Sequence, residues 1–84
     1  MAKVLINDTE FDLISYYLHS TGLSMRIDGE DTTISDIETA AGDLAEVRIE
    51  NKLIFEDLTL RSVSEEHDYF GRSYLKTDFT TSES

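Results

Sequence analysis

Cysteine is absent from this chain of 84 residues. Disulfide bonds and thiolate metal sites are therefore excluded, and the composition fits a reducing cytoplasm. Long apolar runs are missing too, since the start of the chain has only three consecutive aliphatic residues, Val4 to Ile6, before Asn7. That run is too short for a signal peptide, and no stretch approaches the roughly 18 apolar residues of a membrane span. We expect a cytoplasmic protein without a membrane segment.

Basic residues are scarce. Seven Lys and Arg stand against 18 Asp and Glu, which leaves a formal net charge of −11. A surface this acidic repels nucleic acid and anionic membranes and attracts basic protein surfaces. The predicted partner is therefore the basic surface of a protein, and direct binding to nucleic acid or a membrane is not expected.

The length allows one domain with a small core, because a chain of this size buries roughly 60–65% of the surface that it exposes when unfolded. No internal repeat or linker divides the sequence. Residues 1–79 are predicted to form a single compact domain. Residues 80–84, Thr-Thr-Ser-Glu-Ser, have the composition of a disordered tail.

Apolar and polar residues alternate between short turn sequences, as in Leu23, Met25 and Ile27. This period of two is typical of a half-buried strand. Strands are predicted near residues 2–6, 23–28, 44–50, 53–63 and 72–80. Residues 9–19 fit either a helix or a strand, and the sheet-favouring residues Ile14, Tyr16 and Tyr17 incline the prediction toward a strand.

One helix is indicated near residues 35–42. Ser35 and Glu38 have the spacing of a capping box, and Asp36 adds negative charge at the helix N-terminus. Gly42 supplies a left-handed stop. The predicted fold class is α+β, a small antiparallel β-sheet with one short α-helix.

Two acidic segments are the nearest thing to a chemical site, since neither His19 nor His67 has the spacing of a metal site or a catalytic triad. The contiguous ionisable groups of residues 65–68, Glu-Glu-His-Asp, favour a solvated hairpin loop over a metal site, because ligands must converge from several directions. Residues 28–31, Asp-Gly-Glu-Asp, lack the alternating acidic positions of a calcium loop and indicate a turn. No catalytic residue, metal or cofactor is predicted.

Aromatic residues are numerous for so small a domain. Phe11, Phe55 and Phe79 are predicted to pack in the core, whereas Tyr69 and Phe70, beside the second acidic segment, are candidates for an interface. The predicted partner-binding residues are Asp28, Glu30, Asp31, Glu65, Glu66, Asp68, Tyr69 and Phe70.

A short, cysteine-free and strongly acidic chain with these two loops resembles the small accessory proteins of phages and prophages. Among them are anti-CRISPR proteins and other DNA mimics, and the resemblance lies in size and charge over the whole chain. It implies a protein that occupies the nucleic-acid channel of an enzyme. It describes a small phage tail or head component equally well.

Two functions are therefore expected, both without catalysis. The first is a stoichiometric inhibitor whose carboxylates imitate phosphates and occupy a basic nucleic-acid-binding surface. The second is a structural or assembly subunit of a phage-like particle, a possible homo-oligomer in which exposed strand edges pair between copies. Acidic residues gathered at one place would favour the first.

Overall fold

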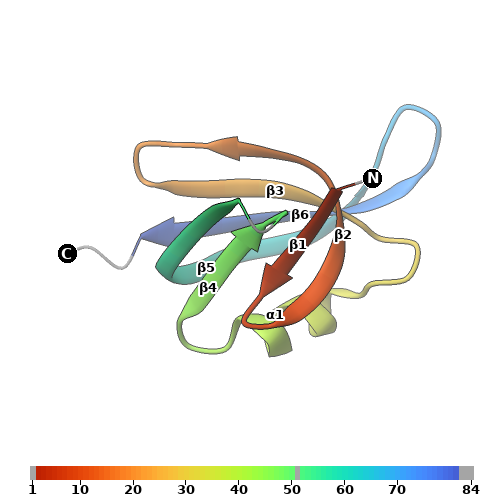
Figure 1. Ribbon diagram of the computed structural model, residues 1–84. Coiled ribbons are helices and arrows are strands. Elements are labelled where there is room, and N and C mark those ends of the chain that lie inside the picture. The colour runs from red at the N-terminus through yellow and green to blue at the C-terminus, as the bar shows by residue number, and fades with distance from the viewer. Residues whose placement is uncertain (1, 51, 82–84) are drawn as a thin grey trace.

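The computed structural model describes residues 2–50 and 52–81 of the chain. Within these residues all strand pairings are antiparallel, and the strands close into a barrel in the order β1-β2-β3-β6-β5-β4 (Figure 1). Along the sequence the elements are β1 (Ala2–Ile6), β2 (Thr9–Leu18), β3 (Gly22–Asp28), α1 (Ile34–Ala41), β4 (Ala45–Ile49), β5 (Leu53–His67) and β6 (Ser73–Thr81).

The closed barrel shows that the predicted α+β fold, a small sheet with one helix, is wrong. The segments expected to be strands are strands, and the ambiguous residues 9–19 supply β2. The sheet closes because β1 pairs with β4, as in Val4 with Ile49, and β3 pairs with β6 over its whole length. These partners lie far apart in the sequence, and alternation does not specify which strands pair.

Irregularities in the ladders bend the sheet. The register shifts at three places, each with one extra residue in one strand: between Leu13 and Ser15 in β2, between Phe55 and Leu58 in β5, and between Leu60 and Ser62 in β5. A bulge bends its strand and increases the local twist. β5 can therefore pair with β4 at its start and with β6 along the rest, which joins the two sides of the barrel.

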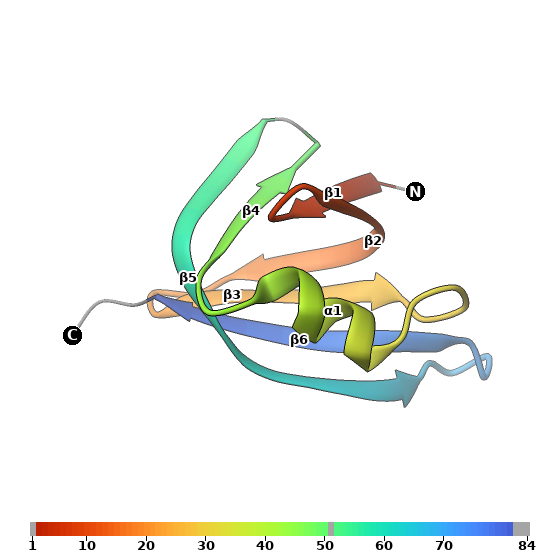
Figure 2. The same cartoon turned by 90° about the horizontal axis from the view of Figure 1, so that it is seen from below.

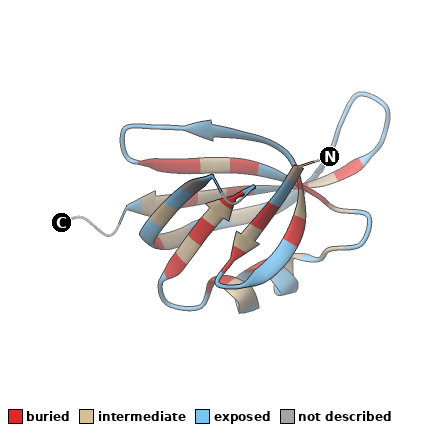
Figure 3. Cartoon of the chain, in the orientation of Figure 1, coloured by how far each residue is buried: buried red, intermediate tan, exposed pale blue. Residues whose placement is uncertain are grey.

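Inward-facing residues of every strand fill the barrel, and residues between them are half-buried or exposed (Figure 3). Phe11 and Phe79 belong to this core as predicted, and Phe55 packs against it partly buried. The remaining fully packed side chains are mostly aliphatic: Val4, Ile6, Leu13, Leu23, Met25, Ile27, Ile37, Val47, Ile49, Leu58 and Leu75.

The helix is capped by Thr33 and not by Ser35, and it begins one residue earlier than predicted. Thr33 is the N-cap: its hydroxyl accepts from the Asp36 N–H, and the Asp36 carboxylate accepts from the Thr33 N–H. The Ser35 and Glu38 capping box is therefore wrong, although Gly42 does end the helix with a φ of 57°. α1 lies against the barrel, where it packs on β5, β1 and β4 (Figure 2). Its Ile37 side chain is buried there.

Asn7 ties the β1–β2 turn to the end of the helix. Its Nδ2 lies 3.0 Å from the carbonyl oxygens of Ala40, Ala41 and Leu44, and its Oδ1 accepts from the Glu46 N–H at 2.8 Å. One exposed amide side chain thus joins β1, α1 and β4, a contact that local sequence patterns do not indicate.

The long strands extend beyond the closed part of the barrel. β1 pairs with β2 only from Thr9 to Leu13, and beyond the bulge β2 pairs with β3 alone. The β2–β3 turn and the end of β6 lie at one end of the molecule, and the β5–β6 turn lies at the other (Figure 1). β6 includes Thr80 and Thr81, so the predicted tail of residues 80–84 begins too early; residues 82–84 lie outside the described residues.

Candidate functional site

The two acidic segments meet at Ser73, the first residue of β6. The Glu30 carboxylate accepts from the Ser73 N–H at 3.2 Å, and the Glu65 carboxylate accepts from the Ser73 hydroxyl at 2.8 Å. Gly29 packs directly against the same residue, because a Cβ there would lie 2.6 Å from the Ser73 Oγ. Segments that are far apart in the sequence therefore form one surface. We call it the acidic end, made of Asp28, Glu30, Asp31, Glu65, Glu66, Asp68, Tyr69 and Phe70.

Two of these carboxylates serve the fold. Asp68 accepts from the N–H groups of Phe70 at 2.8 Å and Arg72 at 2.9 Å, so it shapes the turn between β5 and β6. Asp28 is 8% exposed and accepts from the Glu30 N–H at 3.3 Å. Neither side chain is fully available to a partner, although both were predicted to bind one.

Asp31 and Glu66 are the exposed carboxylates of the acidic end that bind least within the protein. Glu66 approaches the Tyr74 hydroxyl at 3.5 Å, the limit of a hydrogen bond, and no hydrogen bond is found for the Asp31 side chain among the described residues. Together with the second oxygens of Glu30 and Glu65 they present the free negative charge.

Tyr69 and Phe70 stand at the tip of the β5–β6 turn. They are 96% and 88% exposed, and their rings meet edge to face with centroids 5.4 Å apart. Large, exposed aromatic side chains are typical anchors of protein interfaces.

The acidic end is not neutralised from within the described part of the chain. In the described residues, ion pairs join Lys3 to Asp12 and Arg48 to Glu46, and both pairs lie away from the acidic end. The hydrogen bond to Asp12 raises the pKa of the Lys3 amine above its ordinary value. No Lys or Arg among these residues lies within 4.0 Å of an acidic-end carboxylate, so the end keeps its negative charge.

Metal ligation was the alternative for the second acidic segment. Across residues 2–50 and 52–81, no three His, Cys, Asp or Glu side chains are arranged to hold a metal ion. Glu65 and Asp68 instead bind the Ser73 hydroxyl and the turn amides. A hollow of about 290 Å³ separates Glu65 from the first turn of α1.

A cationic strip lies on the outer face of β3, β6 and β5. Arg26 and Lys76 are direct cross-strand partners, and Arg61 shares a hollow with Lys76. The Arg26 guanidinium lies 5.1 Å from the centre of the Tyr74 ring. The sequence does not indicate this strip, because each cation by itself is an ordinary outward-facing residue. The signal exists only once β3 is paired with β6.

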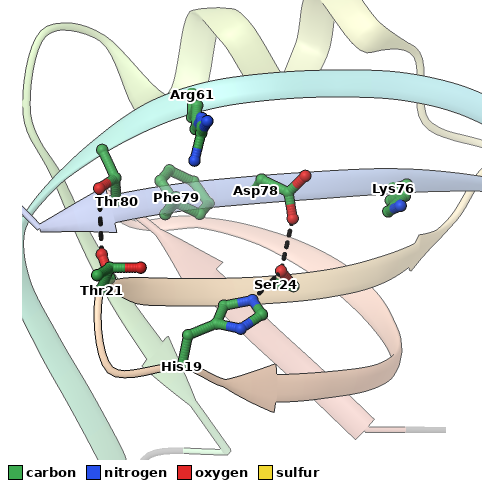
Figure 4. Close-up of a pocket in the computed structure, with 8 residues that line it drawn as sticks. All are labelled: His19, Thr21, Ser24, Arg61, Lys76, Asp78, Phe79 and Thr80. Atoms are coloured by element: carbon green, nitrogen blue, oxygen red, sulfur yellow. Dashed lines mark hydrogen bonds between the residues drawn. The ribbon is translucent and has the colours of Figure 1, made fainter.

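A hollow of about 450 Å³ near the β2–β3 turn holds a serine, Ser24, beside a histidine, His19 (Figure 4). The Ser24 hydroxyl donates its proton to the Asp78 carboxylate at 2.5 Å. The Nε2 of His19 lies 2.5 Å from the Ser24 hydroxyl oxygen. A serine hydrolase needs the opposite order, in which serine gives its proton to the imidazole. Here the network braces the outer face of the sheet.

No family model, curated protein or solved structure matches this chain. In the described residues, no helix is long and apolar enough to cross a membrane. Any functional assignment therefore depends on the side chains of the acidic end, the cationic strip and the exposed strands.

Proposed function

We propose that this protein is a non-catalytic, cytoplasmic binding protein whose acidic end docks on a basic surface of another protein. The surface that fits it best is the nucleic-acid-binding surface of an enzyme, which the protein would inhibit stoichiometrically in the manner of an anti-CRISPR or DNA-mimic protein. The observation that carries the proposal is the convergence of both acidic segments on Ser73.

The physical basis is the uncompensated charge. A basic surface that pairs its Lys and Arg side chains with the phosphates of a polyanion can pair them with any suitably placed set of carboxylates. Asp31, Glu66, Glu30 and Glu65 are exposed and lack basic partners within the described chain, so each can pair with Arg or Lys on the target. Tyr69 and Phe70 would add an apolar anchor at the centre of the contact.

Neutralisation of the exposed carboxylates tests the proposal. The double variant Asp31→Asn/Glu66→Gln should capture the target from a bacterial lysate at least about tenfold more weakly than the parent, because rim charges govern association. Captured proteins, identified by mass spectrometry, should include nucleic-acid-binding proteins. An excess of duplex DNA should displace them from the parent protein.

A matched control removes the same charge elsewhere. Glu50 and Glu56 are exposed on the β4–β5 hairpin, away from the acidic end, and Glu50→Gln/Glu56→Gln should bind nearly as the parent does. If duplex DNA and the bound protein form a ternary complex freely, or if both double variants lose affinity equally, mimicry is wrong.

A second candidate function is a structural or assembly subunit of a phage-like particle. A different part of the fold favours it, the outer half of β2, where Ile14, Tyr16, Tyr17 and Leu18 are all exposed. This function requires contacts between copies of the chain, and the acidic end is not needed for them.

A further inference from the structure

The β2–β3 hairpin carries the longest uncharged segment of the chain. Residues 13–25 contain no Asp, Glu, Lys or Arg, although 30% of all residues are charged. Four large apolar side chains of this segment are 43–67% exposed: Ile14, Tyr16, Tyr17 and Leu18. A neutral apolar surface on a protein of net charge −11 needs a physical explanation.

The same segment is a sheet edge. β1 pairs with β2 only as far as Leu13, and no described strand lies along the other side of residues 15–18. Figure 1 shows this part of β2 standing free at the end of the molecule opposite the β5–β6 turn, and Figure 3 shows it exposed. Exposed apolar edges of this kind pair with other strands unless charge or proline protects them, and here neither does.

The hairpin geometry determines which backbone groups face the edge. The His19 N–H donates to the Gly22 carbonyl at 2.8 Å, so the pair of His19 and Gly22 is a hydrogen-bonded one. Hydrogen-bonded and non-hydrogen-bonded pairs alternate in an antiparallel ladder. Tyr17, opposite Ser24, therefore bonds to β3, whereas Tyr16 and Leu18 direct their N–H and C=O groups toward the free edge.

We propose that this edge pairs with the β2 edge of a second copy, antiparallel about a two-fold axis through Tyr17. Tyr16 of one copy then exchanges backbone hydrogen bonds with Leu18 of the other, and Leu18 with Tyr16. The two Tyr17 side chains face each other in a non-hydrogen-bonded pair, where side chains are closest and aromatic pairs stabilise the sheet. The sheet continues from one barrel into the other.

The absence of charged residues at this edge permits a second copy as its occupant. Two molecules of net charge −11 repel each other wherever carboxylates face carboxylates. Pairing centred on Tyr17 brings together only residues of the uncharged segment. The two-fold axis also makes the contact self-complementary, since both copies present the same unpaired donors and acceptors. The acidic end lies at the far end of each copy and stays free.

The absence of cysteine permits a position-specific test. A non-hydrogen-bonded pair places its Cα atoms about 4.5 Å apart, within the range of a disulfide. Oxidation of Tyr17→Cys should therefore give a covalent dimer in high yield. Tyr69→Cys lies at the opposite end and is more exposed, 96% against 67% for Tyr17, yet it should cross-link at least about tenfold more slowly because only random collisions bring it together.

Sedimentation of the full chain supplies the second measurement. The parent should be a dimer, and Tyr16→Pro or Leu18→Lys should be a folded monomer. Proline at position 16 removes a backbone N–H that faces the free edge, and it breaks no hydrogen bond between β2 and β3. Tyr69→Lys should remain a dimer. A parent that stays monomeric up to about 1 mM overturns the proposal, as does a dimer that survives both edge variants. Equal cross-linking of the two cysteine variants overturns it too.

Discussion

Asp68 and Asp31 have the same side chain, but they contribute differently to the acidic end. Asp68 accepts two backbone N–H groups of its own turn, and Asp31 points its charge into solvent. Formal charge in a sequence does not distinguish them, because the difference arises from where the turn places each carboxylate. All six acidic residues were predicted to serve a partner. Hydrogen bonding separates those that hold the fold, such as Asp68, from those that stay free for a partner, such as Asp31.

Replacing Asp68 with Ala should lower the free energy of unfolding by about 1–2 kcal/mol, because the N–H groups of Phe70 and Arg72 lose their acceptor. Thermal melting measures the loss. Asp68→Asn keeps the Oδ1 acceptor and should retain most of the stability, while Asp31→Asn should leave the melting temperature unchanged. Equal melting of Asp68→Ala and the parent would show that the turn does not depend on this carboxylate.

At the scale of elements, local patterns predicted most of the strands. Met25 and Ile27 alternate with Ser24 and Arg26, and β3 buries the first pair and directs the second outward. The helix was found to within one residue, because Gly42 and the acidic first turn are local signals. Which of Thr33 and Ser35 caps it depends on the path of the chain leaving β3, so the spacing of Ser35 and Glu38 was misleading.

The two possible caps give a direct comparison. Thr33→Ala should cost about 1 kcal/mol of stability, since the Asp36 N–H loses its acceptor at the start of a short helix. Ser35→Ala should change stability by less than about 0.5 kcal/mol, because its hydroxyl is exposed. Urea denaturation of the two variants and the parent measures both. A larger loss in Ser35→Ala would reverse the assignment of the cap.

At the scale of the whole molecule, closure was the part of the fold that the sequence could not predict. Val4 pairs with Ile49, and Gly22 pairs with Thr80, so both pairings depend on the curvature of the complete sheet. The same holds for the site. Glu30 and Glu65 were identified as candidates from composition, but their common partner Ser73 appears only when β3, β5 and β6 are assembled.

The separation of charged and neutral surfaces predicts opposite effects of salt. Binding of a basic partner to the acidic end should weaken as salt rises, because screening shortens to about 8 Å at physiological ionic strength. Pairing of two copies through β2 should strengthen, because salt screens the repulsion between two net charges of −11. Association rates with the partner and sedimentation of the protein alone, each from low salt to about 0.5 M, measure the two effects. Equal responses would mean that a single surface serves both contacts.

The seam between β1 and β4 is the shortest pairing of the barrel, three residue pairs against seven between β3 and β6. Local opening starts where the fewest contacts must break, so the closed barrel should briefly become an open, curled sheet by separation of these two strands. In native-state hydrogen exchange, amides of Leu5 and Arg48 should exchange well before those of Met25 and Thr77. Proteases would then cut first beside this seam, and Asn7, which joins β1 to α1 and β4, would determine how often it opens.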